Sequence, residues 1–251
     1  MSTNQMTQWP AGVDRIVLDS TTSTMTEAAQ MAASITSPTW IMAHQQTDGR
    51  GRRGRAWLTP KGNLTATLVF KPHCTPAQAA QRSFLAANAL YNALAIYVPS
   101  EKLSLKWPND VLLQGGKVAG ILLESAGQHG AVSYLSIGIG VNLQTIPQGV
   151  TDVAFAPTSL KASGGWDVHA IDFLTTLANA YVDQEALLAT HGFTRIRTDW
   201  LKHAAKLGEV ITARTASAEI TGTFDTIDKD GNLVLITGAG PQVIPAADVY
   251  F

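Results

Sequence analysis

The sequence predicts a mixed α/β domain followed by a small all-β module. Up to about residue 206, segments with the two-residue period of strands are interleaved with alanine- and leucine-rich segments typical of helices. Beyond that point the remaining segments are short alternating strands, separated by glycine-containing turns. A chain of 251 residues can form one large domain and one small one. We therefore expect a first domain at residues 1–206 and a C-terminal β module at residues 207–251.

The first predicted helix, at residues 24–33, directly follows a predicted strand at residues 13–19. Thr24 and Glu27 have the spacing of a capping box. Ser23 and Thr24 have two interpretations. Capping the helix is the commoner role for such a pair, but a hydroxyl at a helix N-terminus can also bind a ligand beside the free N–H groups.

The most distinctive stretch is GRGRRGRAW at residues 49–57. Four arginines and three glycines fall within seven residues, with no acidic residue among them. Glycine allows close backbone approach, and arginine presents a planar fork of donors that fits phosphate and carboxylate groups. The stretch does not match the Walker A pattern. Because it lies between strands predicted at residues 39–44 and 64–70, we interpret it as an anion-binding loop rather than a flexible RGG-like segment.

A second group of polar residues surrounds a predicted hairpin. A long helix at residues 75–97 precedes it, and the strands are predicted at residues 103–107, 111–114 and 117–124. Pro108 ends the first strand, and Gly115-Gly116 is the predicted two-residue turn. The side chains that gather here are those of Lys106, Asn109, Asp110 and Lys117. Their proximity indicates a site, whereas Lys117 alone would be read as an exposed lysine at a strand start.

The strand predicted at residues 132–143 carries Gly138, Gly140 and Asn142. Glycines two residues apart on a strand indicate the close approach of a ligand or of another part of the chain, and packing against a helix explains them nearly as well. Helices at residues 167–189 and 193–201 follow. The C-terminal module has the size of an SH3-like barrel, with strands predicted at residues 209–215, 218–225 and 232–236.

Composition excludes several classes of protein. The net charge is −1, whereas proteins built for nucleic acid are usually basic. One cysteine, Cys74, permits no internal disulfide and suits a reducing compartment. The longest apolar stretch, at residues 84–98, is interrupted by Asn88 and Asn92 and is too short to span a bilayer. We expect a cytoplasmic protein without membrane association.

Taken together, these motifs resemble those of the bacterial biotin protein ligases. The matching residues are Ser23-Thr24, Gln46, the loop at residues 49–57, KWPND at residues 106–110, Lys117 with Gly120, and Gly138-x-Gly140-Val141-Asn142. The resemblance covers nearly all of the chain from residue 13 onward. It implies a mixed sheet with flanking helices, related to class II synthetases, and a C-terminal SH3-like domain. Since few residues precede the first strand, we expect the ligase-only type without a DNA-binding domain.

The resemblance also implies a two-step reaction. Biotin and ATP, with Mg²⁺, would give biotinyl-5′-AMP and pyrophosphate. A lysine of the biotin carboxyl carrier domain of a carboxylase would then take the biotinyl group. No DNA partner is expected, and the family includes both monomers and homodimers. The loop at residues 49–57 is expected to be mobile without ligand, because closely spaced like charges repel and glycine is costly to order.

Site residues carried over from the family fall into three groups. Arg52, Lys117 and Asp110 are expected to be catalytic, with Asp110 orienting or deprotonating the carrier lysine. The expected biotin-binding residues are Ser23, Thr24, Gln46, Gly49, Arg50, Gly51, Arg52, Trp57, Lys117, Gly120, Gly138 and Gly140. The residues expected to contact ATP or the adenylate are Arg53, Arg55, Asn109, Lys117 and Asn142. Trp166 lies in the segment that contacts adenine in the family. The sequence identifies no metal ligand.

The chain departs from the family pattern at two places. Met25 replaces a common asparagine, and the chain ends at Phe251 without the arginine that some members carry near that point. Two other functions remain open: a lipoate-type ligase, which also adenylates a carboxylate, and a non-catalytic RNA-binding module that uses the arginine loop and Trp57.

Overall fold

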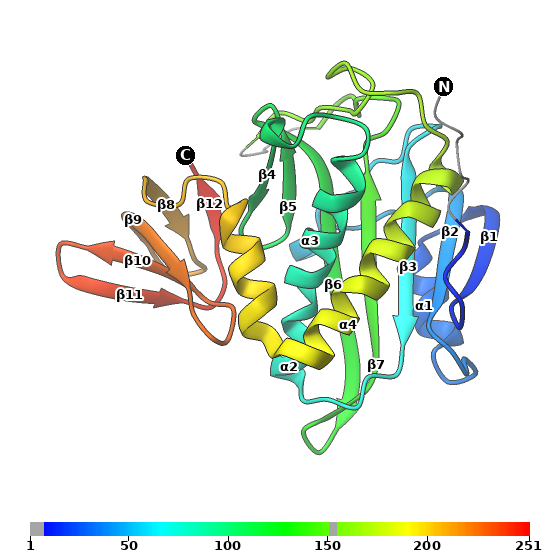
Figure 1. The fold of residues 1–251 in the computed structure, drawn as a ribbon, viewed down its shortest axis with the longest axis horizontal. Helices are drawn as coiled ribbons and strands as arrows, with labels where there is room; N and C mark the ends of the chain where they lie inside the picture. Colours follow the sequence, from blue (N-terminus) through cyan, green and yellow to red (C-terminus); the bar gives the residue numbers. More distant parts are fainter. Residues whose placement is uncertain (1–7, 151–154) are drawn as a thin grey trace.

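The computed structural model describes residues 8–150 and 155–251. Figure 1 shows a large sheet covered by helices, with a smaller sheet beside it. The large sheet consists of β1 (Asp14–Thr21), β2 (Thr39–Gln46), β3 (Leu64–Phe70), β4 (Leu103–Lys106), β5 (Asp110–Leu113), β6 (Gly116–Gln128) and β7 (Ala131–Val141). Its strand order is β1-β2-β3-β7-β6-β5-β4. The pairing is parallel between β1 and β2 and antiparallel elsewhere. This confirms the expected mixed α/β fold.

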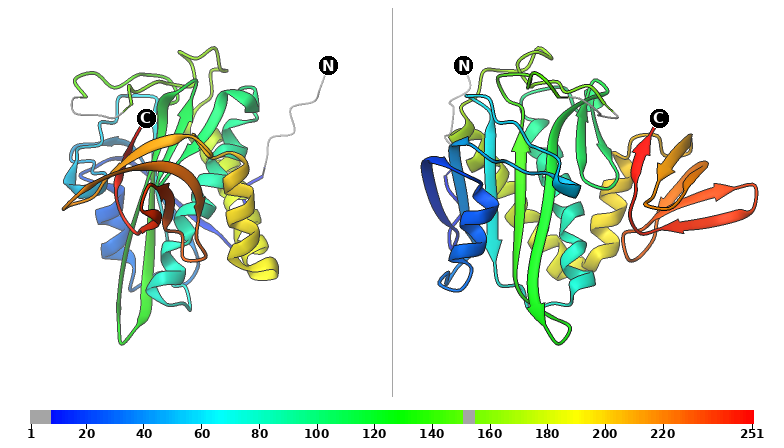
Figure 2. Two further views of the ribbon diagram at one scale, coloured as in Figure 1. Left: turned by 90° about the vertical axis from the view of Figure 1, so that its left-hand side faces the viewer. Right: turned by 180° about the vertical axis from the view of Figure 1, so that it is seen from behind.

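Helices cover both faces of this sheet. They are α1 (Thr24–Met31), α2 (Pro76–Ala80), α3 (Arg82–Leu94) and α4 (Ala170–Lys202), and there are 3₁₀ turns at η1 (Arg52–Gly54) and η2 (Ser100–Lys102). With the sheet seen edge-on in the left view of Figure 2, α3 and α4 lie on one side and α1 lies on the other. Burial on both faces explains why six of the seven β3 residues are buried. No helix within the described residues is long and apolar enough to cross a membrane.

The smaller sheet is antiparallel and contains more strands than the sequence predicted. Its strands are β8 (Val210–Arg214), β9 (Glu219–Ile227), β10 (Leu233–Thr237), β11 (Gly240–Ile244) and β12 (Asp248–Tyr250), in the order β11-β10-β9-β8-β12. The sequence predicted three of these. It missed β11 and β12 because GPQVI begins with glycine and proline and DVY is too short to show a period.

Three local predictions were wrong. The helix expected at residues 75–97 is divided into α2 and α3. The two-residue turn is Gln114-Gly115, with φ values of 51° and 80°, rather than Gly115-Gly116. Ser23, not Thr24, caps α1 by accepting a hydrogen bond from the Met25 N–H. Glu27 accepts its hydrogen bond from Thr21 Oγ1, 2.6 Å away, so the expected capping box does not form.

The two sheets meet at Gly231 in the turn between β9 and β10. The Trp107 Nε1–H donates to the Gly231 carbonyl oxygen at 3.0 Å, and Phe84 packs against the same turn. Gly231 has a φ of 89°, in the left-handed region, and a Cβ there would lie 2.7 Å from the Phe84 ring. This joint needs glycine for both its conformation and its space.

We predict that Gly231→Ala lowers the free energy of unfolding by roughly 1–3 kcal/mol, because it adds backbone strain and a clash with Phe84. Urea unfolding would measure the loss. Gly238→Ala is the matched control, since a Cβ at Gly238 meets nothing within 4 Å. Equal losses in the two variants would contradict the prediction.

Candidate active site

The arginine loop folds as a small hairpin across the sheet. The Gly51 N–H donates to the Arg55 carbonyl oxygen at 2.7 Å, and the Trp57 N–H donates to the Gly49 carbonyl oxygen at 2.8 Å. The tip turns through η1, where Arg53 and Gly54 have φ values of 57° and 72°. In the right view of Figure 2 the loop passes in front of β7 and β6, on the same face as α1. This places its side chains above the centre of the sheet.

A cavity of about 450 Å³ lies between the loop and the sheet. Fifteen of the expected site residues line it: Ser23, Thr24, Gln46, Arg50, Gly51, Arg52, Arg55, Trp57, Asn109, Asp110, Lys117, Gly120, Gly138, Gly140 and Asn142. Its apolar lining includes Met25, Ala66, Ile121, Leu122 and Ile139. Gly49 and Arg53 do not line it. A Cβ on Gly49 would lie 2.7 Å from Gln46 Nε2 and would overlap the Trp57 carbonyl, so that glycine is needed for the loop's shape.

Three glycines give the cavity its floor. Gly120 of β6 and Gly140 of β7 are directly paired across the two strands. A Cβ on Gly140 would overlap the Trp57 indole, and one on Gly120 would lie 3.1 Å from it. A Cβ on Gly138 would lie 2.8 Å from the Met25 sulfur. Gly140 must be glycine because the Trp57 ring occupies the place of a side chain, while side chains at Gly120 and Gly138 would crowd Trp57 and Met25. Trp57 therefore both anchors the loop and forms a wall of the cavity.

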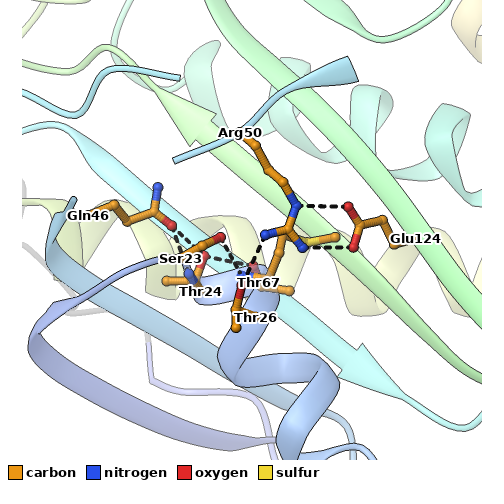
Figure 3. A network of polar contacts seen from close by, with 8 residues as sticks. Ser23, Thr24, Thr26, Gln46, Arg50, Thr67 and Glu124 are labelled. Carbon is orange, nitrogen blue, oxygen red and sulfur yellow. Dashed lines mark hydrogen bonds and ion pairs between the residues drawn. The ribbon is translucent and has the colours of Figure 1, made fainter. Parts of the chain in front are cut away.

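One end of the cavity is polar and neutral. Gln46 Oε1 accepts hydrogen bonds from the Thr24 N–H and the Thr24 hydroxyl, at 2.8 and 3.0 Å. Thr67 of β3 donates to Thr24 Oγ1 at 2.8 Å (Figure 3). Ser23 adds a hydroxyl that accepts a hydrogen bond from the Met25 N–H. This end presents uncharged donors and acceptors, in contrast to the charged end described next.

Three of the four loop arginines are paired with carboxylates. Arg50 makes two hydrogen bonds to Glu124 of β6, at 3.1 and 3.0 Å, and a third to Thr26 Oγ1 (Figure 3). The hydrogen bond with Glu124 raises the pKa of Arg50. Arg53 and Arg55 both pair with Asp248 of β12, at 2.6 and 2.7 Å. The loop is thus held to α1, to the large sheet and to the C-terminal sheet, which argues against a solvated RNA-binding segment.

Asp248 connects the loop to the C-terminal sheet. Its side chain is 14% exposed, whereas its two arginine partners are 42% and 51% exposed. Burial disfavours its carboxylate, but hydrogen bonding from Arg55 and the charges of nearby arginines outweigh burial and lower its pKa. The C-terminal sheet therefore contributes to this site through Asp248.

Arg52 differs from the other three arginines. Its side chain donates a hydrogen bond to the Asn109 side-chain oxygen at 3.3 Å, and within residues 8–150 and 155–251 no carboxylate forms an ion pair with it. Burial lowers its pKa. A half-buried cation without an ion-paired carboxylate is suited to binding an anion.

Two lysines and an aspartate line the cavity near Arg52. Asp110 Oδ1 lies 2.6 Å from Lys117 Nζ, and Asp110 Oδ2 lies 3.7 Å from Lys106 Nζ. The Lys106 side chain is 5% exposed, and burial lowers its pKa. Lys117 also lies over the Trp57 ring, 5.6 Å from its centroid. With one carboxylate between two ammonium groups, this end of the cavity keeps a surplus of positive charge.

The two asparagines position the cavity wall. Asn109 accepts from Arg52 and donates from Nδ2 to the Ile121 carbonyl oxygen at 2.7 Å, so it fixes the guanidinium to β6. Asn142 donates to the Thr158 carbonyl oxygen at 3.0 Å and accepts from Asn63.

A family model described as "Biotin/lipoate A/B protein ligase family" matches residues 17–142. The chain belongs to this family. A second model, "Biotin protein ligase C terminal domain", matches residues 206–251. This agrees with the resemblance that the sequence motifs indicated.

Relatives of known name cover nearly the whole chain. The chain is 48% identical to the biotin--[acetyl-CoA-carboxylase] ligase of Paracoccus denitrificans, over 94% of this chain and 99% of the relative. It is 32% identical to the bifunctional ligase/repressor BirA of Bacillus subtilis, over 93% of this chain and 71% of the relative. The biotin protein ligase from Aquifex aeolicus, solved in complex with biotin and ATP, matches with a TM-score of 0.78 at 25% identity, over 94% of this chain and 98% of that one. The match to this ligase confirms the fold that the resemblance implied.

The sequence analysis placed Lys106 in a candidate site without giving it a role, and it did not identify Glu124 or Asp248. Glu124 and Asp248 gave no local signal, because they lie 74 and more than 190 residues from the arginines that they pair with. Trp166 does not line the cavity and is 73% exposed. The expected roles of the individual site residues stay predictions.

We predict that Glu124→Lys loosens the loop, because it places a like charge beside Arg50. Amide hydrogen exchange at Gly51 and Trp57 should become roughly tenfold faster. The same measurement on the unchanged protein tests the expectation that the loop is mobile without ligand.

The control is Asp199→Lys, which reverses the charge of an ion-paired aspartate on α4, on the opposite face of the sheet from α1 and the loop (Figure 2). Unchanged exchange in Glu124→Lys, or the same acceleration in Asp199→Lys, would contradict a role for Glu124 in holding the loop.

Proposed function

We propose that the chain is an ATP-dependent biotin protein ligase. It activates biotin as biotinyl-5′-AMP and transfers the biotinyl group to a lysine of a biotin carboxyl carrier domain. The observation that carries the proposal is that the cavity has three chemically different parts. A neutral polar end suits the ureido ring, an apolar middle suits the ring sulfur and the tail, and the Arg52 end suits the carboxylate and phosphates. The named relatives support the same reaction.

In the first step a biotin carboxylate oxygen attacks the α-phosphorus of ATP. A new P–O bond forms, the bond between the α-phosphorus and the α,β-bridging oxygen breaks, and pyrophosphate leaves. Two anions must approach each other, so the barrier depends on cations that are already in place. Arg52 and Lys117 supply them, with Arg52 fixed by Asn109 and Lys117 fixed by Asp110. Such preorganisation stabilises charge without reorganising the site during the reaction.

Arg53 and Arg55 have a different role from Arg52 and Lys117. Both are held by Asp248, so they can reach the nucleotide phosphates only by exchanging that carboxylate for phosphate. We assign them to closing the loop over the nucleotide.

In the second step the carrier lysine attacks the acyl carbon of the adenylate, and AMP leaves. The amine must first lose a proton, since its reference pKa is about 10.4. The Asp110 side chain lines the cavity. We propose that its carboxylate orients the carrier amine and removes the proton from it.

Mg²⁺ is expected with ATP. Among the described residues no group of three or more His, Cys, Asp and Glu side chains could hold a metal ion. Asp110 and Asp248 are both paired with cations. With few free carboxylates in the site, Mg²⁺ would be coordinated mainly by the ATP phosphates and water, as is usual in nucleotide sites. When bound, the ion neutralises phosphate charge beside Arg52 and Lys117.

We further propose that residues 1–206 form the catalytic domain and residues 207–251 a domain that closes the site through Asp248. The net charge of −1 gives no support for a DNA partner. The single cysteine and the use of ATP support a cytoplasmic location. A monomer and a homodimer are both compatible with this function.

The reaction is tested by ATP–pyrophosphate exchange with biotin, with lipoate and without an acid. Exchange with biotin alone is the expected result, because the polar end of the cavity is built for a ureido ring. Exchange with lipoate alone would favour the lipoate-type function. No exchange with either acid would contradict the proposal.

We predict that Asp110→Asn slows transfer to the carrier lysine by roughly 100-fold or more, the range for loss of a general base. Adenylate formation should fall by less than roughly tenfold, since the cations of step one remain and the asparagine oxygen can still accept a hydrogen bond from Lys117. Single-turnover assays of the two steps would separate these effects. Asp199→Asn, which alters an ion-paired aspartate on α4, is the control. Equal losses in both steps would exclude this role.

A further inference from the structure

Thr67 has a buried hydroxyl group that does not reach the cavity but is hydrogen-bonded to Thr24, which does. Its exposed fraction is 0%, and it does not line the cavity. It lies on β3, directly paired with Gly138 of β7, and its hydroxyl meets Thr24 Oγ1 (Figure 3). A valine would fill the same space on a strand, so the presence of a polar group here requires an explanation.

The hydrogen atoms in this network can be placed by elimination. The Thr24 backbone N–H can only donate, and it lies 2.8 Å from Gln46 Oε1. The amide oxygen of Gln46 therefore faces Thr24, and its NH₂ group faces away. An amide oxygen can only accept, so the Thr24 hydroxyl, 3.0 Å away, must donate its proton to Gln46.

This leaves one direction for the contact between the two threonines. The Thr24 proton is already given to Gln46, so Thr67 is the donor across the 2.8 Å to Thr24 Oγ1. A hydroxyl oxygen has two acceptor positions, and Thr67 fills one of them. Thr24 therefore meets a ligand as an acceptor.

We propose that Thr67 is a positioning residue. Gln46 takes the Thr24 proton, and Thr67 fills one acceptor position of the Thr24 hydroxyl and so orients the other toward the substrate. This end of the cavity then selects a ligand with an N–H donor. The inference rests on the proposed function. In that function the donor is one ureido N–H of biotin, and lipoate, which has a dithiolane ring without N–H groups, offers nothing to this acceptor. Thr67 thus contributes to the choice between the two acids without contacting either.

The test is a cycle that combines variants with ligands. The ligands are biotin and two cyclic carbamates, in each of which one ureido N–H is replaced by oxygen. For each ligand, kcat and KM in pyrophosphate exchange are compared between the unchanged protein and Thr67→Val. If Thr67 acts through Thr24 on one ureido N–H, Thr67→Val should raise KM roughly tenfold for biotin and for the carbamate that keeps this N–H. A roughly tenfold change is the size expected for one hydrogen bond. For the carbamate that lacks the relevant N–H the change should be below roughly twofold. The value of kcat should stay the same throughout.

Two further variants separate positioning from packing. Thr67→Ser keeps the donor and should retain the KM of the unchanged protein for all three ligands. Thr39→Val removes another buried threonine hydroxyl, which bonds the Ser37 carbonyl oxygen away from the cavity, and gives the cost of a lost structural hydrogen bond. Should Thr67→Val prove much less stable than Thr39→Val, Thr67→Cys keeps the volume with a weaker donor and enters the same cycle.

A rise in KM by the same factor for all three ligands, or no rise with any of them, would overturn the inference, because a packing role does not distinguish the N–H groups. If the unchanged protein catalyses no pyrophosphate exchange with biotin, that is a different result. It would contradict the proposed ligase function rather than the role of Thr67.

Discussion

The structure depends on compensating the positive charge of the loop at residues 49–57. Four arginines within six residues repel one another, and the intervening glycines make the loop costly to order. Glu124 of β6 and Asp248 of β12 pair with three of the four arginines and so compensate two of their charges. Arg52 lacks such a carboxylate among the described residues and lines the cavity. The contacts that close the loop therefore also leave one cation in place for an anionic substrate.

The closed loop also requires a floor without side chains. Gly120 and Gly140 are paired across β6 and β7, and Trp57 lies where their side chains would be. The indole thereby closes one side of the cavity and lies beneath the Lys117 ammonium group. Charge compensation brings the loop to the sheet, and these glycines let it come close enough to enclose a substrate.

The sequence predicted the parts of the site that are local in the chain. The arginine loop, the hairpin with Lys106, Asp110 and Lys117, and the strand glycines each gave a pattern within a dozen residues. The contacts that organise them come from far away and leave no such pattern, as Glu124, Asp248 and Thr67 show. The wrong capping prediction has the same cause. Thr24 fits a capping box locally, but its N–H and hydroxyl are used by Gln46, 22 residues on.

The central claim is that the four arginines have different roles, set by their partners. The most direct test is the single-turnover rate of adenylate formation, at saturating biotin and ATP, for Arg52→Gln and Arg53→Gln. The account predicts a loss of roughly 100-fold or more for Arg52→Gln, which removes a half-buried cation from the developing charge. Arg53→Gln should lose less than roughly tenfold, since this exposed side chain holds the loop through Asp248. Equal losses in the two variants would contradict the account.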